Sequence, residues 1–247
     1  MTFKVLGMAT AVPPCSVEQV EAAAFAAELI PRDRGADRLL KTLYRRSGVR
    51  RRYSVVLDRD ASVDSQVPVA THAGRKDWQT IDVEELRARQ RLFGPRADDR
   101  DEGPTTARRM EYYEQYAGGL AAEAAARAIQ RSGVGAHDIT HLVTVSCTGF
   151  VAPGVDLALI ELLGLPSTTL RTHIGFMGCH GAINGLRVAS AFASSDPQST
   201  VLLCAVELCS LHHQYGWHPE RIVANSLFAD GAGAVVGRES DDSNGGG

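Results

Sequence analysis

The stretch HIGFMGCHGAINGLRVASAF, residues 173–192, decides the fold. An apolar strand pattern runs into Gly178 and Cys179, and a helix pattern begins directly after them. Gly175, Gly178 and Gly181 indicate a tight turn at this junction, because glycine tolerates strained backbone angles and close approach. A strand, a tight turn and a helix in this order favour an α/β fold that presents a nucleophile at the turn.

Cys179 is the candidate nucleophile of this stretch. Helix N-termini carry unpaired N–H groups and a partial positive charge, and both stabilise a thiolate, the nucleophilic form of cysteine. The same N–H groups suit the oxyanion of a thioester under attack. The alternative is a buried cysteine at a strand–helix junction, but the flanking glycines make room around the sulfur and favour catalysis. The apolar face of the helix is expected to be Ala182, Ile183, Leu186, Ala189 and Phe192.

The other four cysteines carry weaker signals. No C-x-x-C pair occurs, which argues against a zinc ribbon or a redox dithiol, and free thiols are expected in a reducing cytosol. Cys204 lies within the apolar run VLLCAVEL and is predicted to be inert core. Cys15 follows Pro13-Pro14 in a loop, and Cys209 follows a strand end, where packing is its expected role.

Working outward from residues 173–192, strand and helix patterns alternate along the chain. Strands are predicted over residues 4–12, 139–147, 170–176, 201–208 and 232–238. Helices are predicted over 17–30, 36–48, 105–133, 155–165, 181–195 and 219–228, the first with Ser16 as its N-cap and Gln19 completing a capping box. This alternation predicts an α/β fold with a mostly parallel or mixed central sheet.

One domain over residues 1–238 is expected, with a variable, loop-rich insertion at 57–103 and a polar, Gly-rich tail at 239–247. The insertion is polar and weakly periodic, with one helix pattern over 82–93 that Gly94-Pro95 ends. Just before it lies a basic cluster: Arg45, Arg46, Arg50, Arg51 and Arg52. A solvated surface and an anion site for a phosphate-bearing substrate arm explain this cluster equally well.

Composition excludes several classes of function. The 247 residues are 44% hydrophobic with a formal net charge of -3, so no basic excess points to nucleic acid or an anionic membrane. No apolar run approaches the roughly 20 residues of a membrane span, and the N-terminus lacks the regions of a signal peptide. We therefore expect a cytoplasmic protein that has neither a membrane nor a nucleic-acid partner and no metal site.

Three motifs in order resemble the type III polyketide synthase (chalcone/stilbene synthase) family. They are THLVTVSCTGFVAPGVDLALIELLGL at 140–165, IGFMGCHGAINGLR at 174–187, and NSLFADGAGAVV at 225–236, whose Ala falls one place off the family pattern. Looser likeness extends the match over residues 3–238, except 57–103. The resemblance implies the first, N-terminal half of a thiolase-like fold: a βαβαβ-type α/β unit with a mixed sheet flanked by helices.

The resemblance also implies roles for particular residues. Cys179 matches the thiol that accepts an acyl group from coenzyme A, and Phe228 matches the gatekeeper between the CoA tunnel and the reaction cavity. Ala152 matches the residue that projects across the dimer interface, and Arg46 matches a contact to CoA phosphates, whereas Leu39 and Thr42 stand where two further basic residues are expected. The remaining matches line the cavity: Cys147, Cys209, Leu211, His212 and Ala224.

These departures imply a cavity of altered shape and polarity, with an aliphatic acyl starter as the indicated substrate. Acyl-CoA and malonyl-CoA are the implied substrates, no further cofactor is expected, and a homodimer or association with a C-terminal half is implied. The family's catalytic His and Asn belong to its second half, which the sequence does not resemble, so the chain is expected to be incomplete as a synthase. Two alternatives remain: a ketoacyl-ACP synthase-like condensing enzyme, and a non-catalytic remnant or dimerisation subunit.

Overall fold

The computed structural model describes residues 3–30, 34–58, 81–98 and 100–240. Its chain divides into two compact units. Unit 1 consists of Met1–Val12, Met110–Leu208 and Gly231–Gly247, and unit 2 of Pro13–Arg109 and Cys209–Asp230. The predicted insertion and tail are only partly visible, because residues 59–80, 99 and 241–247 lie outside the described residues.

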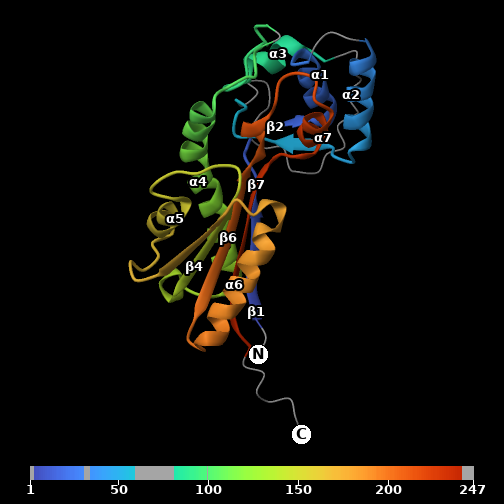
Figure 1. The fold of residues 1–247 in the computed structure, drawn as a ribbon. Coiled ribbons are helices and arrows are strands. Elements are labelled where there is room, and N and C mark those ends of the chain that lie inside the picture. Colours follow the sequence, from blue (N-terminus) through green and yellow to red (C-terminus); the bar gives the residue numbers. More distant parts are fainter. Residues whose placement is uncertain (1–2, 31–33, 59–80, 99, 241–247) are drawn as a thin grey trace. The chain divides into compact units, whose positions relative to one another are not determined.

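Unit 1 is built on a mixed sheet, as the sequence predicts (Figure 1). The strand order is β1-β7-β6-β4-β5. β1 pairs antiparallel with β7, whereas β4 pairs in parallel with both β5 and β6. The strands are β1 (Phe3–Ala11), β4 (His141–Ser146), β5 (Leu170–Gly175), β6 (Thr200–Leu208) and β7 (Asp230–Glu239).

Helices cover both faces of this sheet. Leu203 and Cys204 are consecutive residues of β6, so their side chains point to opposite faces. Helix α6 (Gly181–Ser195) packs on the Leu203 face, while the Cys204 thiol donates to the Ala121 carbonyl of α4 (Thr106–Ser132), 3.5 Å away. A 3-10 turn at Ala136–Asp138 precedes β4. Helix α5 (Val155–Leu163) then connects β4 to β5.

The packing face of α6 differs from the predicted one. Of the five predicted positions only Ala189 is fully buried, and Ile183 is exposed. The buried seam consists of Gly181, Gly185, Ala189 and Ala193. A Cβ at Gly185 would lie 2.7 Å from Leu203 Cδ1, so the smallest residues bring the helix backbone against the sheet. The larger apolar side chains therefore flank the contact instead of forming it.

Unit 2 is a small helical unit with a short two-stranded antiparallel ladder. Its helices are α1 (Gln19–Glu28), α2 (Arg34–Arg46), α3 (Val83–Ala88) and α7 (Pro219–Leu227), and β2 (Ser16–Glu18) pairs antiparallel with β3 (Arg51–Tyr53). Leu40, Tyr44 and Ile222 lie in its core, joined by small residues of α1. Cys209–His212 forms a 3-10 turn between β6 and the α7 region.

Two sequence predictions in unit 2 are wrong in detail. Ser16 is not a helix cap, because it pairs with Tyr53 in the β2–β3 ladder and the helix begins only at Gln19. Glu18 is the N-cap, and its N–H donates to the Glu21 carboxylate at 2.7 Å. The helix predicted over 82–93 ends at Ala88, because Gln90 forms a β-bridge with Leu57.

No helix in the described part of the chain is long and apolar enough to span a bilayer. Over those same residues, no group of three His, Cys, Asp or Glu side chains is placed to hold a metal ion.

Candidate active site

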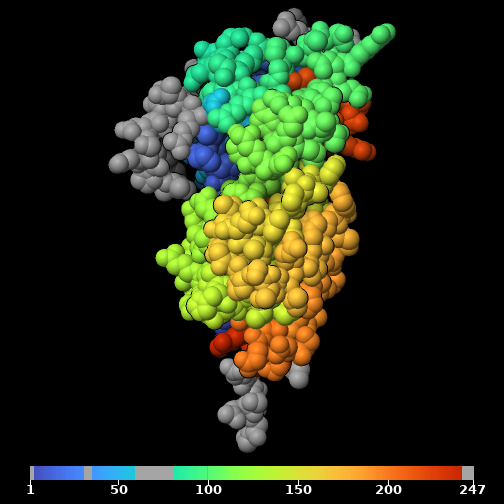
Figure 2. Space-filling model, turned by 90° about the vertical axis from the view of Figure 1, so that its left-hand side faces the viewer, coloured from blue at the N-terminus to red at the C-terminus, as the bar shows by residue number. Residues whose placement is uncertain are grey.

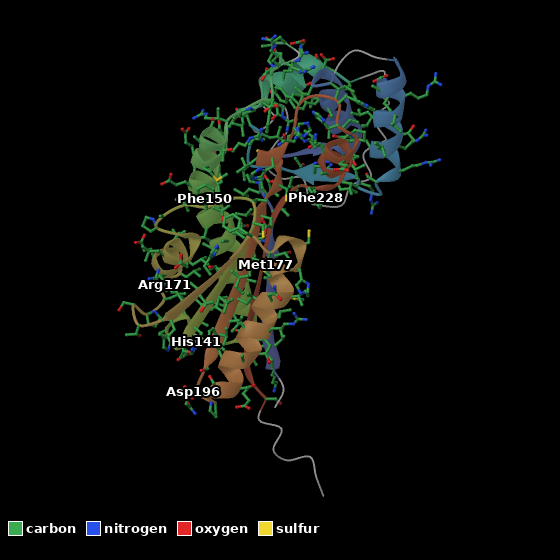
Figure 3. All side chains as sticks on the ribbon, viewed as in Figure 1. His141, Phe150, Arg171, Met177, Asp196 and Phe228 are labelled. Atoms are coloured by element: carbon green, nitrogen blue, oxygen red, sulfur yellow. The ribbon has the colours of Figure 1, made fainter. Side chains whose placement is uncertain are left out.

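Cys179 lies on a tight turn between β5 and α6. The turn passes through two residues in the left-handed region, Phe176 with φ 58° and Gly178 with φ 61°. Cys179 sits in the following 3-10 turn, Gly178–His180, which runs directly into α6, and its side chain is exposed. Met177, labelled in Figure 3, belongs to the same turn and is half-exposed. The strand–turn–helix arrangement predicted from the sequence is therefore confirmed.

Phe176 has a left-handed conformation, and it is the non-glycine residue with a positive φ in the described part of the chain. A bulky residue with positive φ is uncommon and costs on the order of 1–3 kcal/mol. Phe176 also leaves 76% of its surface exposed, so its side chain gains little burial in return. Backbone strain of this kind clusters at active sites, where the surrounding structure holds a reacting group in place. Here the group that the turn presents is the Cys179 thiol.

Cys147 follows β4 and lies beside the Cys179 turn. Its thiol donates to the Gly178 carbonyl at 3.6 Å. The Glu207 carboxylate, near the end of β6, fixes the backbone there by accepting the Cys147 N–H at 2.9 Å and the Thr148 hydroxyl at 2.6 Å. Parallel strands end at the same edge of a sheet, so β4 and β6 bring Cys147 and its anchor to the end of β5 that carries the turn.

A buried tyrosine supports the same edge from α4. The Tyr113 hydroxyl donates to Ser146 Oγ at 2.7 Å, and burial raises the pKa of Tyr113 to about 12. Its ring packs directly on Gly149, where a Cβ would lie 2.2 Å from the ring carbons. Gly149 is therefore required by close packing. This contact holds the loop that follows Cys147.

Ala152 lies in the loop between β4 and α5 and is exposed. The loop also exposes Phe150 and contains a cis peptide bond between Ala152 and Pro153. Figure 2 shows the face of unit 1 on which α5 and the edge strand β5 lie, in yellow. The role of Ala152 at a dimer interface stays a prediction.

The remaining cysteines of the chain differ sharply from Cys179. Cys204 is wholly buried in β6, and burial raises the pKa of its thiol to about 12, which confirms the prediction of inert core. Cys15 is buried, and Cys209 is partly buried. Only Cys179 among the five has an exposed side chain.

Within unit 2, Phe228 follows the last turn of α7 (Figure 3). Its N–H donates to the Ala224 carbonyl at 3.1 Å, so these two predicted cavity residues share one helical turn. The Phe228 carbonyl accepts a hydrogen bond from the Arg52 guanidinium. The Phe228 side chain is 46% exposed, and its role as a gatekeeper stays a prediction.

Three further predicted cavity residues lie on the 3-10 turn that begins unit 2's second segment. Leu211 is wholly buried, Cys209 is partly buried and His212 is exposed. The turn is fixed by Asp230, whose carboxylate accepts the Ser210 N–H and hydroxyl, both at 2.7 Å. Burial raises the pKa of Asp230 above its ordinary value. Structure alone assigns no cavity role to these three residues.

The basic cluster divides into two groups. Arg45, Arg46 and Arg50 are exposed near the end of α2, as an anion site or a solvated surface requires. Arg51 instead pairs with Glu18 at 2.5 Å. Arg52 turns inward, and burial lowers the pKa of its guanidinium. Neither sequence interpretation therefore holds for all five arginines.

Two residues of the site were missed by sequence reasoning. Glu207 is the only acidic residue in the run VLLCAVEL, and a lone charge at the end of a buried strand was the signal available. Tyr113 gives no such signal, since its neighbours on α4 include other tyrosines. His180, next to Cys179 in the sequence, places its Nε2 3.4 Å from Arg187 Nη1.

Comparison with known proteins agrees with this geometry. The family model described as chalcone and stilbene synthases, N-terminal domain, matches residues 97–240. An alpha-pyrone synthesis polyketide synthase-like protein, Pks18 of Mycobacterium tuberculosis, is 32% identical over 177 residues, covering 72% of this chain and 44% of that protein. Type III polyketide synthase C of Arabidopsis thaliana is 38% identical over 135 residues, covering 54% of this chain and 35% of that protein.

Among solved structures, PKS-I from the brown alga Ectocarpus siliculosus superposes with a TM-score of 0.76 at 30% identity, covering 100% of this chain and 59% of that one. The type III polyketide synthase domain of Steely1 from Dictyostelium, at 24% identity and a TM-score of 0.75, covers 97% of this chain and 57% of that one and supports the fold. The chain thus spans about half the length of the relatives it matches. It has the thiolase-like fold and belongs to the chalcone and stilbene synthase family of type III polyketide synthases, as an N-terminal domain.

Proposed function

We propose that this chain carries the nucleophile of a type III polyketide synthase and accepts acyl groups from acyl-CoA on Cys179. The observation that carries the proposal is the exposed Cys179 thiol, held on the Phe176–Gly178 turn directly ahead of α6. The N-terminal N–H groups of a helix stabilise both a thiolate and the oxyanion of a thioester under attack. No bound cofactor beyond the coenzyme A thioesters enters the proposal.

The proposed reaction has two steps: transfer of the acyl group to Cys179, and its condensation with malonyl-CoA. In the first, the Cys179 thiolate attacks the acyl-CoA carbonyl, and the C–S bond to coenzyme A breaks, so that the CoA thiolate leaves and takes up a proton. In the second, malonyl-CoA loses CO2, and its α-carbon attacks the acyl-Cys179 carbonyl. The bond to Cys179 then breaks, which returns the thiolate and releases a β-ketoacyl-CoA.

Other residues are proposed to shape this reaction. We assign Phe228 to the gate of the cavity, and Cys147, Ala152, Cys209, Leu211, His212 and Ala224 to its walls. Arg46, exposed at the end of α2, is assigned to the phosphates of coenzyme A, with Lys41, Arg45 and Arg50 as further candidates. Cys147 stands out, because its thiol contacts the Gly178 carbonyl beside the nucleophile.

The base and the second oxyanion donor are proposed to come from a further segment or a partner chain. In the family a His and an Asn of the second half act with the cysteine. His180 is a weak substitute, because its ring contacts Arg187. We therefore propose that loading of Cys179 is slow in this chain alone and accelerates when a C-terminal half supplies these groups.

Intact mass after exposure to a panel of acyl-CoAs tests the proposal. We expect a thioester adduct on the wild-type chain that disappears in Cys179→Ala and persists in Cys209→Ala. Acyl groups on a carrier protein serve as the parallel arm: faster loading from the carrier would favour a ketoacyl-ACP synthase-like activity instead. No adduct from either donor, even after addition of a separately expressed C-terminal half of a relative, would contradict the assignment of Cys179.

A further inference from the structure

A cavity of about 70 Å³ lies inside unit 2, formed entirely by residues of that unit. Its wall is mainly apolar. Helix α1 contributes Phe25, α3 contributes Leu86, and Phe93 and Leu57 close the cavity from the adjoining loops. A water molecule needs roughly 10–15 Å³ of such space, so the cavity has room for about five to seven non-hydrogen atoms.

Three of the residues that line this cavity each have a buried side-chain atom without a hydrogen-bond partner: Arg52 (Nη1), Gln90 (Oε1) and His213 (Nε2). All three are shielded from solvent. Buried polar atoms in folded proteins are almost always paired, because an unpaired one forfeits its bonds to water. Because three residues with such atoms line one mainly apolar space, we infer that the space accommodates a polar partner.

Arg52 defines the charge of the missing group. Its Nη2 donates to the Phe228 carbonyl, and its guanidinium lies 6.0 Å from the centre of the Tyr44 ring. The Asp230 carboxylate acts electrostatically on Arg52, but Arg52 Nη1 has no hydrogen-bond partner in the described residues. The nearby Asp230 carboxylate already accepts hydrogen bonds from Val55 and Ser210. A buried guanidinium with an open N–H favours an anionic partner.

His213 and Gln90 fit the same partner. The His213 ring lies between Phe25 and Phe93, with ring centres 6.3 and 5.7 Å away. Burial, aided by Arg52 and Arg109, lowers the pKa of His213 to about 3, so the ring is neutral and donates through Nε2 in one tautomer. The Gln90 amide presents either its oxygen or its NH2 group after rotation about its last bond.

We propose that this cavity binds a short-chain monocarboxylate of about the size of butyrate. Its carboxylate receives hydrogen bonds from Arg52 Nη1, His213 Nε2 and the Gln90 amide, and its alkyl chain packs on Phe25 and Phe93. This inference is independent of the function proposed for Cys179, because it uses no residue of unit 1. Within unit 2, Phe228 also lines the cavity, and its carbonyl accepts a hydrogen bond from Arg52.

Titration of the full chain with sodium butyrate, followed by calorimetry and by the NMR signal of ¹³C-carboxyl-labelled butyrate, tests the inference. We expect saturable binding of one butyrate per chain, with a dissociation constant in the millimolar range. Butyramide and butylamine, which lack the negative charge, should not compete. Inorganic phosphate and chloride are added separately: competition by either at equal concentration would show that the site takes any anion and would overturn the assignment of an apolar tail.

Two variants locate the binding. His213→Phe keeps an aromatic ring between Phe25 and Phe93 but removes the nitrogen, and it should weaken butyrate binding roughly tenfold. Arg52→Gln should abolish it, and if that variant does not fold, His213→Phe carries the test by itself. His137→Phe, at an exposed histidine of unit 1, is the matched control and should bind as the wild type does. Absence of saturable binding, or unchanged affinity in His213→Phe, would overturn the proposal.

Discussion

The two units of this chain differ in how completely their polar groups are satisfied. Five buried side-chain polar atoms in the described residues have no partner, and four of them, on Gln19, Arg52, Gln90 and His213, belong to unit 2. Unit 1 contributes only Ser199 Oγ. In unit 1 the chemistry-bearing edge is tightly packed and fully bonded, as the Glu207 and Tyr113 contacts show. Within the described residues, unit 1 pairs nearly all of its buried polar side chains internally, whereas three of the four unpaired atoms of unit 2 belong to residues that line the cavity proposed to bind a monocarboxylate.

Among the substitutions that compare the two units, the largest loss of stability is expected at Gly149 in unit 1. A Cβ there would lie 2.2 Å from the Tyr113 ring, which is itself buried and bonded to Ser146. Gly149→Ala should therefore lower the free energy of unfolding by about 3 kcal/mol. Urea denaturation followed by far-UV circular dichroism measures it. A change below about 1 kcal/mol would show that the edge is not tightly packed.

The next effect concerns the anchor of the Cys147 backbone. Glu207→Gln leaves one oxygen to accept the N–H and hydroxyl groups that the carboxylate now serves, so we expect a loss of about 1–3 kcal/mol in stability. Glu123→Gln breaks only an exposed ion pair with Arg127 and should cost less than about 1 kcal/mol. Equal losses in the two variants by urea denaturation would contradict the role given to Glu207.

Much of unit 1 could be predicted from the sequence, because its signals are local. The strand–turn–helix at 173–192 follows from glycine spacing and apolar patterning, and both survive in the structure. The buried seam of α6 could not be predicted in this way. Helix periodicity points to the large apolar residues, whereas the close approach of the helix to the sheet requires glycine and alanine at the contact. In unit 2, the pairing of Ser16 with Tyr53 is a contact between distant segments and overrides a local cap signal.

Side-chain direction was equally beyond the sequence. Arg45 and Arg52 belong to one basic run, yet the first is exposed and the second turns into unit 2 toward the Phe228 carbonyl. Nothing in the run distinguishes them, because burial of an arginine depends on partners that lie far along the chain. The same holds for Glu207, because its carboxylate accepts hydrogen bonds from Cys147 and Thr148, which lie about 60 residues earlier in the chain.

The pH dependence of the free energy of unfolding would test the burial of the neutral His213 ring in unit 2. The pKa of His213 is lowered from 6.5 to about 3 in the folded chain, so the unfolded chain binds the proton more tightly. Stability contributed by neutral His213 is full above pH 6.5 and is lost as the pH falls toward 3. Between pH 7 and 5 the wild type should lose about 1–2 kcal/mol more than His213→Phe. Parallel pH dependences in urea denaturation would contradict the burial of this ring.

The smallest change in stability is expected at Gly119, a helix glycine that serves as the control for Gly149. Gly119, on the exposed side of α4, has open space where a Cβ would be placed. Gly119→Ala should raise the free energy of unfolding by about 0.5–1 kcal/mol, because alanine loses less backbone entropy in a helix. Thermal denaturation detects the gain. A loss of stability at Gly119 would mean that the cost at Gly149 does not report on the Tyr113 contact.

The most direct test of the central claim is to locate the acyl group after loading from acyl-CoA. Trypsin releases Cys179 in the peptide Thr172–Arg187, which contains no other cysteine, while Cys147 lies in Ser132–Arg171, and Cys204 and Cys209 share Val188–Arg221. The account predicts the acyl mass on Thr172–Arg187, lost on treatment with hydroxylamine as a thioester requires. An acyl mass confined to one of these two peptides, or to the peptide Val5–Arg32 that contains Cys15, would contradict Cys179 as the nucleophile.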